Sequence, residues 1–161
     1  MDRFVGKYLG LVVDNNDPKH IGRIRVKVPE VLPGETTGWA MPSSPLAGKG
    51  TGLAMVPPAN SLVFVEWPAG DVARVPIWSG GAWAEGDGVA GAGPDAIVLV
   101  TPGGHRVELK DTKGQAAVTV KAASGATVIL DDKGVTIEFS GQKVAMTSAS
   151  ISLNDGALTV M

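Results

Sequence analysis

The sequence contains no cysteine, so disulfide bonds and thiolate metal sites are excluded. The absence of cysteine is also compatible with assembly in a reducing compartment. Histidine is scarce, because His20 and His105 are the only two in the chain. A protein zinc site usually needs four nitrogen or sulfur ligands, which a single chain of this composition cannot supply. We therefore expect neither a metal ion nor any other cofactor.

An excess of positive charge is lacking as well. The chain has 14 Lys and Arg against 16 Asp and Glu, which gives a formal net charge of −2. A nucleic-acid-binding protein normally shows a basic face, and this composition does not favour one. No apolar run approaches the ~20 residues of a membrane-spanning helix. The N-terminus lacks the apolar core of a signal peptide, so we expect a soluble protein that is made and assembled in the cytoplasm.

Aromatic residues make up only 5% of the chain, whereas 22 Gly and 11 Pro are spread through it. Such dispersed turn formers predict many short strands rather than helices or a disordered tract. The segment from 21 to 29 shows the strand pattern most clearly: apolar Ile24, Val26 and Val28 alternate with basic residues. An alternation with period two is typical of a half-buried strand.

The first 83 residues are expected to form one domain. The pattern predicts a strand over residues 3–13, a turn over 14–18, the strand at 21–29, and further strands at 53–56, 61–67 and 73–79. About five strands in this length fit a small antiparallel barrel of the OB type, whose closure removes exposed sheet edges. Residues 84–96 are small and glycine-rich, which predicts a linker.

Residues 97–161 have a different character, because short apolar alternating pairs now recur between turn residues. The pairs begin at residues 97, 107, 118, 128, 137, 144, 151 and 158, so the step shortens from ten or eleven residues to seven. Repetition of this kind indicates a repeating β architecture that tapers toward the C-terminus.

These short strands cannot enclose a core within one chain. Each offers two or three apolar side chains, and a meander of them exposes an apolar stripe larger than soluble proteins tolerate. We therefore predict an intertwined trimeric β-helix, a triangular β-prism, stiffened by backbone ladders between chains. The predicted trimer core consists of Val118, Val120, Val128, Leu130, Ile137, Phe139, Val144, Met146, Ile151 and Leu153.

Several segments together resemble a known family. They are Asp14-x-x-Asp17-Pro18, Gly22-Arg23-Ile24-Arg25-Val26-Lys27-Val28-Pro29, Pro76-Ile77-Trp78-Ser79-Gly80-Gly81, Ile97-x-Leu99-x-Thr101-x-Gly103-Gly104-His105, Glu108-Leu109-x-Asp111-Thr112-x-Gly114, Ser124-Gly125-Ala126 and Leu130-Asp131-Asp132-x-Gly134-Val135-x-Ile137. In this order they are similar to baseplate assembly protein V, the central spike of contractile phage tails, and to type VI secretion spikes. The resemblance covers nearly the whole chain.

The resemblance implies a non-enzymatic virion protein. Three copies would form a spike at the centre of the baseplate, beneath a hub made by a separate chain that continues into the tail tube. The spike would carry a small PAAR-like tip-cap protein and be driven through the outer membrane of the target cell on contraction. Residues 84–96 are too few to hold the lysozyme domain found in larger members.

The chain ends on apolar side chains, Leu158, Val160 and Met161. A bare apolar end is unusual in water, so these residues are the predicted docking site for the tip protein.

Other candidate sites have simpler explanations. His105 follows two glycines at a turn, where an imidazole more often bonds to backbone than to a metal ion. The pairs Asp14/Asp17 and Asp131/Asp132 lie at turn positions that favour Asp for local backbone bonding. The glycines at 48, 50 and 52 lack the Lys-Ser/Thr of a P-loop.

Two alternative functions remain open at this stage. An OB barrel can bind single-stranded nucleic acid, here through Arg23, Arg25 and Lys27 with Tyr8, Phe64 or Trp67 as stacking partners. The slightly acidic chain argues against this reading. The second alternative, a wall-degrading enzyme, lacks a catalytic motif in the sequence.

Overall fold

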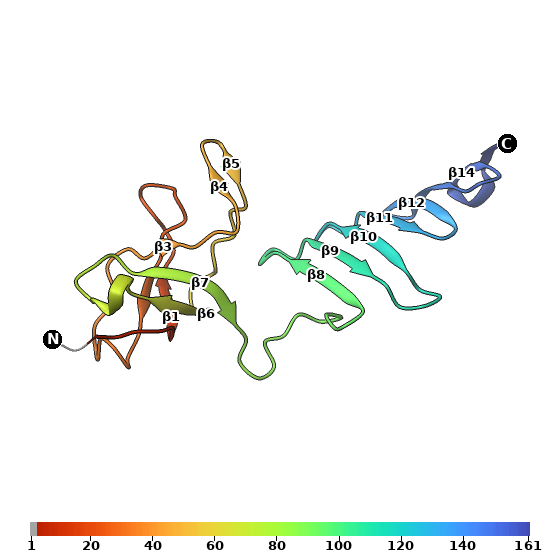
Figure 1. Cartoon of the computed structure of the whole chain (residues 1–161). Helices are drawn as coiled ribbons and strands as arrows, with labels where there is room; N and C mark the ends of the chain where they lie inside the picture. Colours follow the sequence, from red (N-terminus) through yellow and green to blue (C-terminus); the bar gives the residue numbers. More distant parts are fainter. Residues whose placement is uncertain (1–2) are drawn as a thin grey trace. The chain divides into compact units, whose positions relative to one another are not determined.

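The computed structural model describes residues 3–161, and its regular secondary structure consists almost entirely of strands (Figure 1). The chain divides into two compact units, one that ends at Asp87 and one that runs from Gly88 to Met161. The first unit holds a five-stranded sheet and a small separate hairpin, and the second holds a single eight-stranded sheet.

The five-stranded sheet of the first unit has the order β2-β1-β6-β7-β3. Neighbouring strands are antiparallel except for β3 and β7, which are parallel. Its strands are β1 (Tyr8–Asp14), β2 (Arg25–Lys27), β3 (Met41–Pro42), β6 (Leu62–Glu66) and β7 (Ile77–Ala82). A 3₁₀ turn, η1 (Pro68–Gly70), lies between β6 and β7. The separate hairpin consists of β4 (Ala47–Gly48) and β5 (Thr51–Gly52).

Backbone pairing between the two ends of this sheet closes it into a barrel. Next to β2 and β3, the Ile24 and Ala40 backbones exchange hydrogen bonds of 3.2 and 2.8 Å. The buried Thr37 adds two more, since its hydroxyl accepts from the Val26 N–H and its own N–H donates to the Val26 carbonyl. The barrel therefore leaves few strand-edge groups exposed, as closure of an OB-type fold requires.

The alternation read from residues 21–29 is confirmed by burial. Ile24, Val26 and Val28 are fully buried, whereas Arg25 and Lys27 are exposed. The remaining members of the buried core come from the other strands and the connecting loops: Val12, Val31, Ala40, Val63, Val65, Trp67 and Trp78. This single apolar core accounts for the stability of the first unit.

Two strand predictions for the first unit were wrong. Residues 53–56 form no strand; they are exposed, and their place in the barrel is taken by β3, which bonds to β7 through Met41 N–H and the Pro76 carbonyl. The strand expected at 73–79 begins only at Ile77, because Asp71 starts a turn that ends at Arg74 and because Pro76 has no N–H to donate.

The second unit is a meander of eight consecutive antiparallel strands, ordered β15 to β8 along the sheet. The strands are β8 (Ala96–Val100), β9 (Arg106–Lys110), β10 (Ala117–Lys121), β11 (Thr127–Asp131), β12 (Gly134–Phe139), β13 (Gln142–Met146), β14 (Ile151–Leu153) and β15 (Leu158–Val160), with a 3₁₀ turn, η2 (Asn154–Gly156), before the last. Every apolar pair recognised in the sequence lies in one of these strands, and the last two strands are the shortest.

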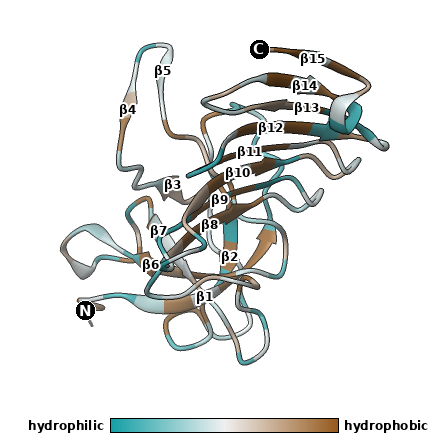
Figure 2. Cartoon of the chain, turned by 90° about the vertical axis from the view of Figure 1, so that its right-hand side faces the viewer, coloured by the Kyte–Doolittle hydropathy of each residue, from teal (hydrophilic) through white to brown (hydrophobic). Residues whose placement is uncertain are grey.

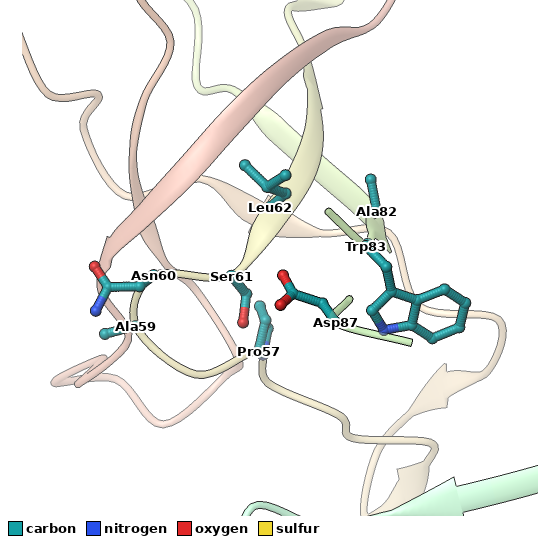
Figure 3. A pocket seen from close by; sticks show the side chains of 9 residues that line it. Pro57, Ala59, Asn60, Ser61, Leu62, Ala82, Trp83 and Asp87 are labelled. Carbon is teal, nitrogen blue, oxygen red and sulfur yellow. The ribbon is translucent and has the colours of Figure 1, made fainter. Parts of the chain in front are cut away.

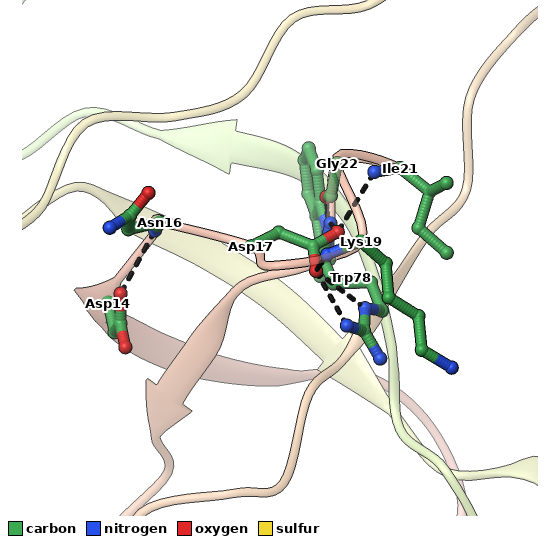
Figure 4. Close-up of polar contacts among 8 residues, drawn as sticks. Asp14, Asn16, Asp17, Lys19, Ile21, Gly22 and Trp78 are labelled. Carbon is green, nitrogen blue, oxygen red and sulfur yellow. Dashed lines mark hydrogen bonds and ion pairs between the residues drawn. The ribbon is translucent and has the colours of Figure 1, made fainter.

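A buried carboxylate organises the loop between β1 and β2 (Figure 4). Asp17 accepts hydrogen bonds from the backbone N–H groups of Lys19, Ile21 and Arg23, at 2.9, 2.9 and 3.2 Å. The Arg23 guanidinium adds bonds of 2.9 and 2.6 Å to the same carboxylate and lies over the Trp39 ring. Asp17 is thus the turn residue expected from the sequence, with all of its acceptor positions used locally.

The Arg23 guanidinium, helped by the three backbone N–H donors, holds the pKa of Asp17 far below its usual range, against the opposing effect of burial. A depressed carboxyl pKa means that the folded state gains stability from the ionised form. That stability is present above the unfolded pKa of about 3.9 and is lost as the pH falls below it.

We predict that Asp17→Asn lowers the melting temperature of the first unit by about 5 °C or more at pH 7, because a domain of this size is sensitive to one broken buried network. The difference from the parent should shrink as the pH falls below about 4. All four tryptophans lie in the first unit, so tryptophan fluorescence reports its unfolding. Asp87→Asn, at an exposed position, is the control, and an equal loss in both variants would refute the role of Asp17.

Candidate oligomerisation surface

One face of the eight-stranded sheet carries two unbroken rows of apolar side chains. The strand register places one residue of every strand in each row. The first row is Ile97, Leu109, Val118, Leu130, Val135, Met146, Ile151 and Val160, and the second is Leu99, Val107, Val120, Val128, Ile137, Val144, Leu153 and Leu158. Figure 2 shows the hydrophobic colour along these strands.

The opposite face of the sheet is largely polar. Its central row, in the same register, is Val98, Glu108, Thr119, Ile129, Thr136, Ala145, Ser152 and Thr159. Arg106 forms an ion pair of 2.8 Å with Glu108 on this face. The sheet is therefore amphipathic, with one face suited to water and the other to a protein interior.

Nothing within the second unit covers the apolar face. From Gly88 to Met161, a range described throughout, no residue is buried, and Ile97 in the first row is 72% exposed. Full burial of a Val, Leu or Ile side chain contributes about 1.5–3 kcal/mol, so two rows of uncovered residues leave much stabilisation unused. A patch of this size marks a surface that another protein chain covers.

Within one chain, the strands of this sheet already hydrogen-bond to their neighbours. All of its ladders join consecutive strands of the same chain, from β8–β9 to β14–β15. The expected ladders between chains remain a prediction about the assembled trimer. The apolar side chains of the exposed face are available for contact with a partner chain.

The predicted trimer-core residues lie on this face, nine of them in the two rows. The tenth, Phe139, is on the same face but pairs with Gln142 outside the rows, and Val135 holds the place in the row instead. Val135 was missed because Ile137 and Phe139 already formed an alternating pair in the sequence. The burial of these residues between chains remains a prediction.

The predicted tip-docking residues end the rows. Leu158 and Val160 are the last members of the second and first rows, and Met161 follows β15. All three are exposed in the single chain.

The remaining candidate residues take part in local bonding. The His105 Nδ1 accepts a long bond of 3.4 Å from the Ala123 N–H. The Asp131 carboxylate accepts from the Lys133 and Gly134 N–H groups, and that of Asp14 accepts from the Asn16 N–H. Among the described residues, no cluster of three or more His, Cys, Asp or Glu is placed to hold a metal ion.

Four of the six residues proposed for nucleic-acid binding are engaged elsewhere. Trp67 is buried in the barrel core, and Tyr8 packs edge-on against it with ring centroids 6.3 Å apart. Arg23 is held by Asp17, and Arg25 donates to the Thr37 carbonyl at 3.3 Å. Of the proposed set, this leaves the exposed Phe64 and Lys27, one aromatic ring and one cation, for such a site.

A hollow on the barrel surface lies between the loop before β6 and the end of β7 (Figure 3). Its polar groups include Asn60, Ser61 and Asp87, and the exposed Trp83 lies at its side. The nine described residues that line it include no histidine or lysine, so Ser61 has no neighbouring base of the kind that activates a nucleophile.

Among residues 3–161, no helix is long and apolar enough to cross a membrane.

The two units define an injector-type OB domain followed by a trimerisation domain. The sequence profile of the type VI secretion system/phage-baseplate injector OB domain matches residues 8–83, and that of the phage baseplate V C-terminal trimerisation domain matches residues 96–159. The chain belongs to this phage baseplate V and spike family, which confirms the family resemblance and the all-β fold class inferred from the sequence. No curated protein matches the chain.

We predict that Val144→Asp disrupts the oligomer, because it places a carboxylate between Ile137 and Leu153 in the second row. Burying that charge in each copy costs several kcal/mol per trimer. Light scattering should report a lower mass and thermal unfolding a lower midpoint. Ala145→Asp is the matched control, since the neighbouring residue points to the polar face. An unchanged mass and midpoint for Val144→Asp contradicts the assignment of Val144 to the covered face.

Proposed function

We propose that three copies of the chain form the central spike of a contractile tail baseplate, or of a related injection apparatus, and pierce the target envelope mechanically. The observation that carries the proposal is the pair of apolar rows, which run through all eight strands and have no cover within the chain. Three sheets with their apolar faces inward form a closed prism with polar faces outward.

The regularity of the rows supports a mechanical role. Each step along the sheet adds one backbone ladder and one residue to each apolar row. The strands shorten from five or six residues to three at β14 and β15, which fits a narrowing end. In this arrangement the OB domain joins a hub made by a separate chain, and the narrow end carries a PAAR-like tip protein.

To test the mechanical role, particles should be assembled with Ile151→Asp, which breaks the first row, or with Ser152→Asp, which changes the polar face of the same strand. The Ile151→Asp particles should lose most envelope penetration, measured as potassium release from target cells, while the Ser152→Asp particles retain it. Electron microscopy of the tails controls for assembly. Full penetration by particles whose spike chain is no longer trimeric contradicts a piercing role.

To test tip docking, Val160→Asp is compared with Thr159→Asp, because these neighbouring residues lie on opposite faces of β15. The Val160→Asp protein should lose binding to the small tip protein of the same particle by at least about tenfold, as expected for a charge placed in an apolar contact. The Thr159→Asp protein should bind like the parent. Binding that survives Val160→Asp and a matching Leu158→Asp change argues against this docking site.

A further inference from the structure

The barrel carries an exposed apolar arm. Residues 44–56, called the arm here, leave the barrel after β3 and include the hairpin β4–β5, which projects from the rest of the unit (Figure 1). Leu46, Leu53 and Met55 are 63%, 46% and 57% exposed, and Val56 is exposed as well. Between Glu35 and Glu66 the only charged residue is Lys49. An exposed segment so poor in charge is suited to contact with protein rather than with water.

Hydrogen bonds at its base hold the arm in shape. The Leu53 N–H donates to the Leu46 carbonyl at 2.9 Å, and the Ser44 hydroxyl lies 2.9 and 2.8 Å from the carbonyls of Leu46 and Leu53. The two sides of the arm are thus joined before any partner binds, which lowers the ordering cost of an interface.

The barrel also carries an apolar patch on its outer surface. The inward residues of β1 and β6 are Gly10, Val12, Val63 and Val65, so the outward residues form the patch: Leu9, Leu11, Val13, Leu62 and Phe64. Leu9 pairs with Phe64 and Leu11 with Leu62 across the two strands. Exposed Lys27 of β2, opposite Leu11, gives the patch a charged rim. Apolar surface with a charged border is typical of an interaction site.

We propose that the arm of one copy packs on the barrel patch of the next copy, so that the three OB domains form a closed ring. This inference rests on the proposed trimer. A three-fold ring needs two different, complementary surfaces on each chain, and the arm and the patch are such a pair. In Figures 1 and 2 the hairpin and strands β1 and β6 lie at opposite ends of the first unit, as a head-to-tail contact requires.

The connection between the units favours a second copy as the occupant. Residues 84–95 span at most about 43 Å when fully extended, at roughly 3.3–3.6 Å per residue. Once the trimerisation domains associate, each barrel is tethered near two others at an effective concentration in the millimolar range. Three copies then cover all arms and all patches, whereas a separate hub chain has to cover both surfaces itself.

Cysteine cross-linking tests the contact, because the chain has no cysteine of its own. Full-length chains with Met55→Cys are co-assembled with chains that carry Leu9→Cys or Leu11→Cys, and mild oxidation is followed on a non-reducing gel. We expect disulfide-linked pairs between copies, on the order of tenfold above the pair of Met55→Cys with Arg74→Cys, an exposed position outside the patch.

Light scattering of the same samples separates this inference from the proposed function. A three-chain mass without cross-linking above the Arg74→Cys control overturns the ring contact and leaves the trimer intact. Cross-links that form only after the hub protein is added also overturn it, because the arm then packs against the patch only in a hub complex. A one-chain mass rejects the trimer itself.

Discussion

The uncovered apolar face of the second sheet is the constraint on which the rest of the structure depends. A single-layer sheet satisfies its backbone hydrogen bonds between its own strands, but it has no second layer to bury its side chains. Two rows of Val, Leu, Ile and Met therefore stay in water until another chain covers them. The family's C-terminal trimerisation domain coincides with this sheet, which agrees with the physical requirement.

The two units solve the same problem in different ways. The barrel curves its sheet until Ile24 meets Ala40, and the resulting core buries Val12, Val63 and both Trp67 and Trp78 without help from another chain. The second sheet stays open and buries no residue within the chain. The first unit is therefore expected to fold alone, whereas the second depends on concentration and on partner chains.

Period-two alternation made much of this fold predictable. In the second unit the apolar pairs mark every strand, and at residues 24–28 the alternation matches burial residue by residue. The wrong predictions fall where the alternation gives no information. Met41–Pro42 is too short to show a period-two pattern, so its pairing with β7 could not be predicted. Phe139 fits the alternation of the row, but the register pairs it with Gln142 and places Val135 beside Met146. Register is decided by turn length, which a side-chain pattern alone does not give.

The backbone and the side chains of the second sheet have separate roles. The ladders of the single chain join neighbouring strands, whereas the apolar rows form the surface that another chain would cover. A charge in a row such as that of Val144 then weakens association first and leaves the local ladder of β12, β13 and β14 in place. Backbone pairing within the chain and the exposed apolar surface are therefore carried by different atoms of the same strands.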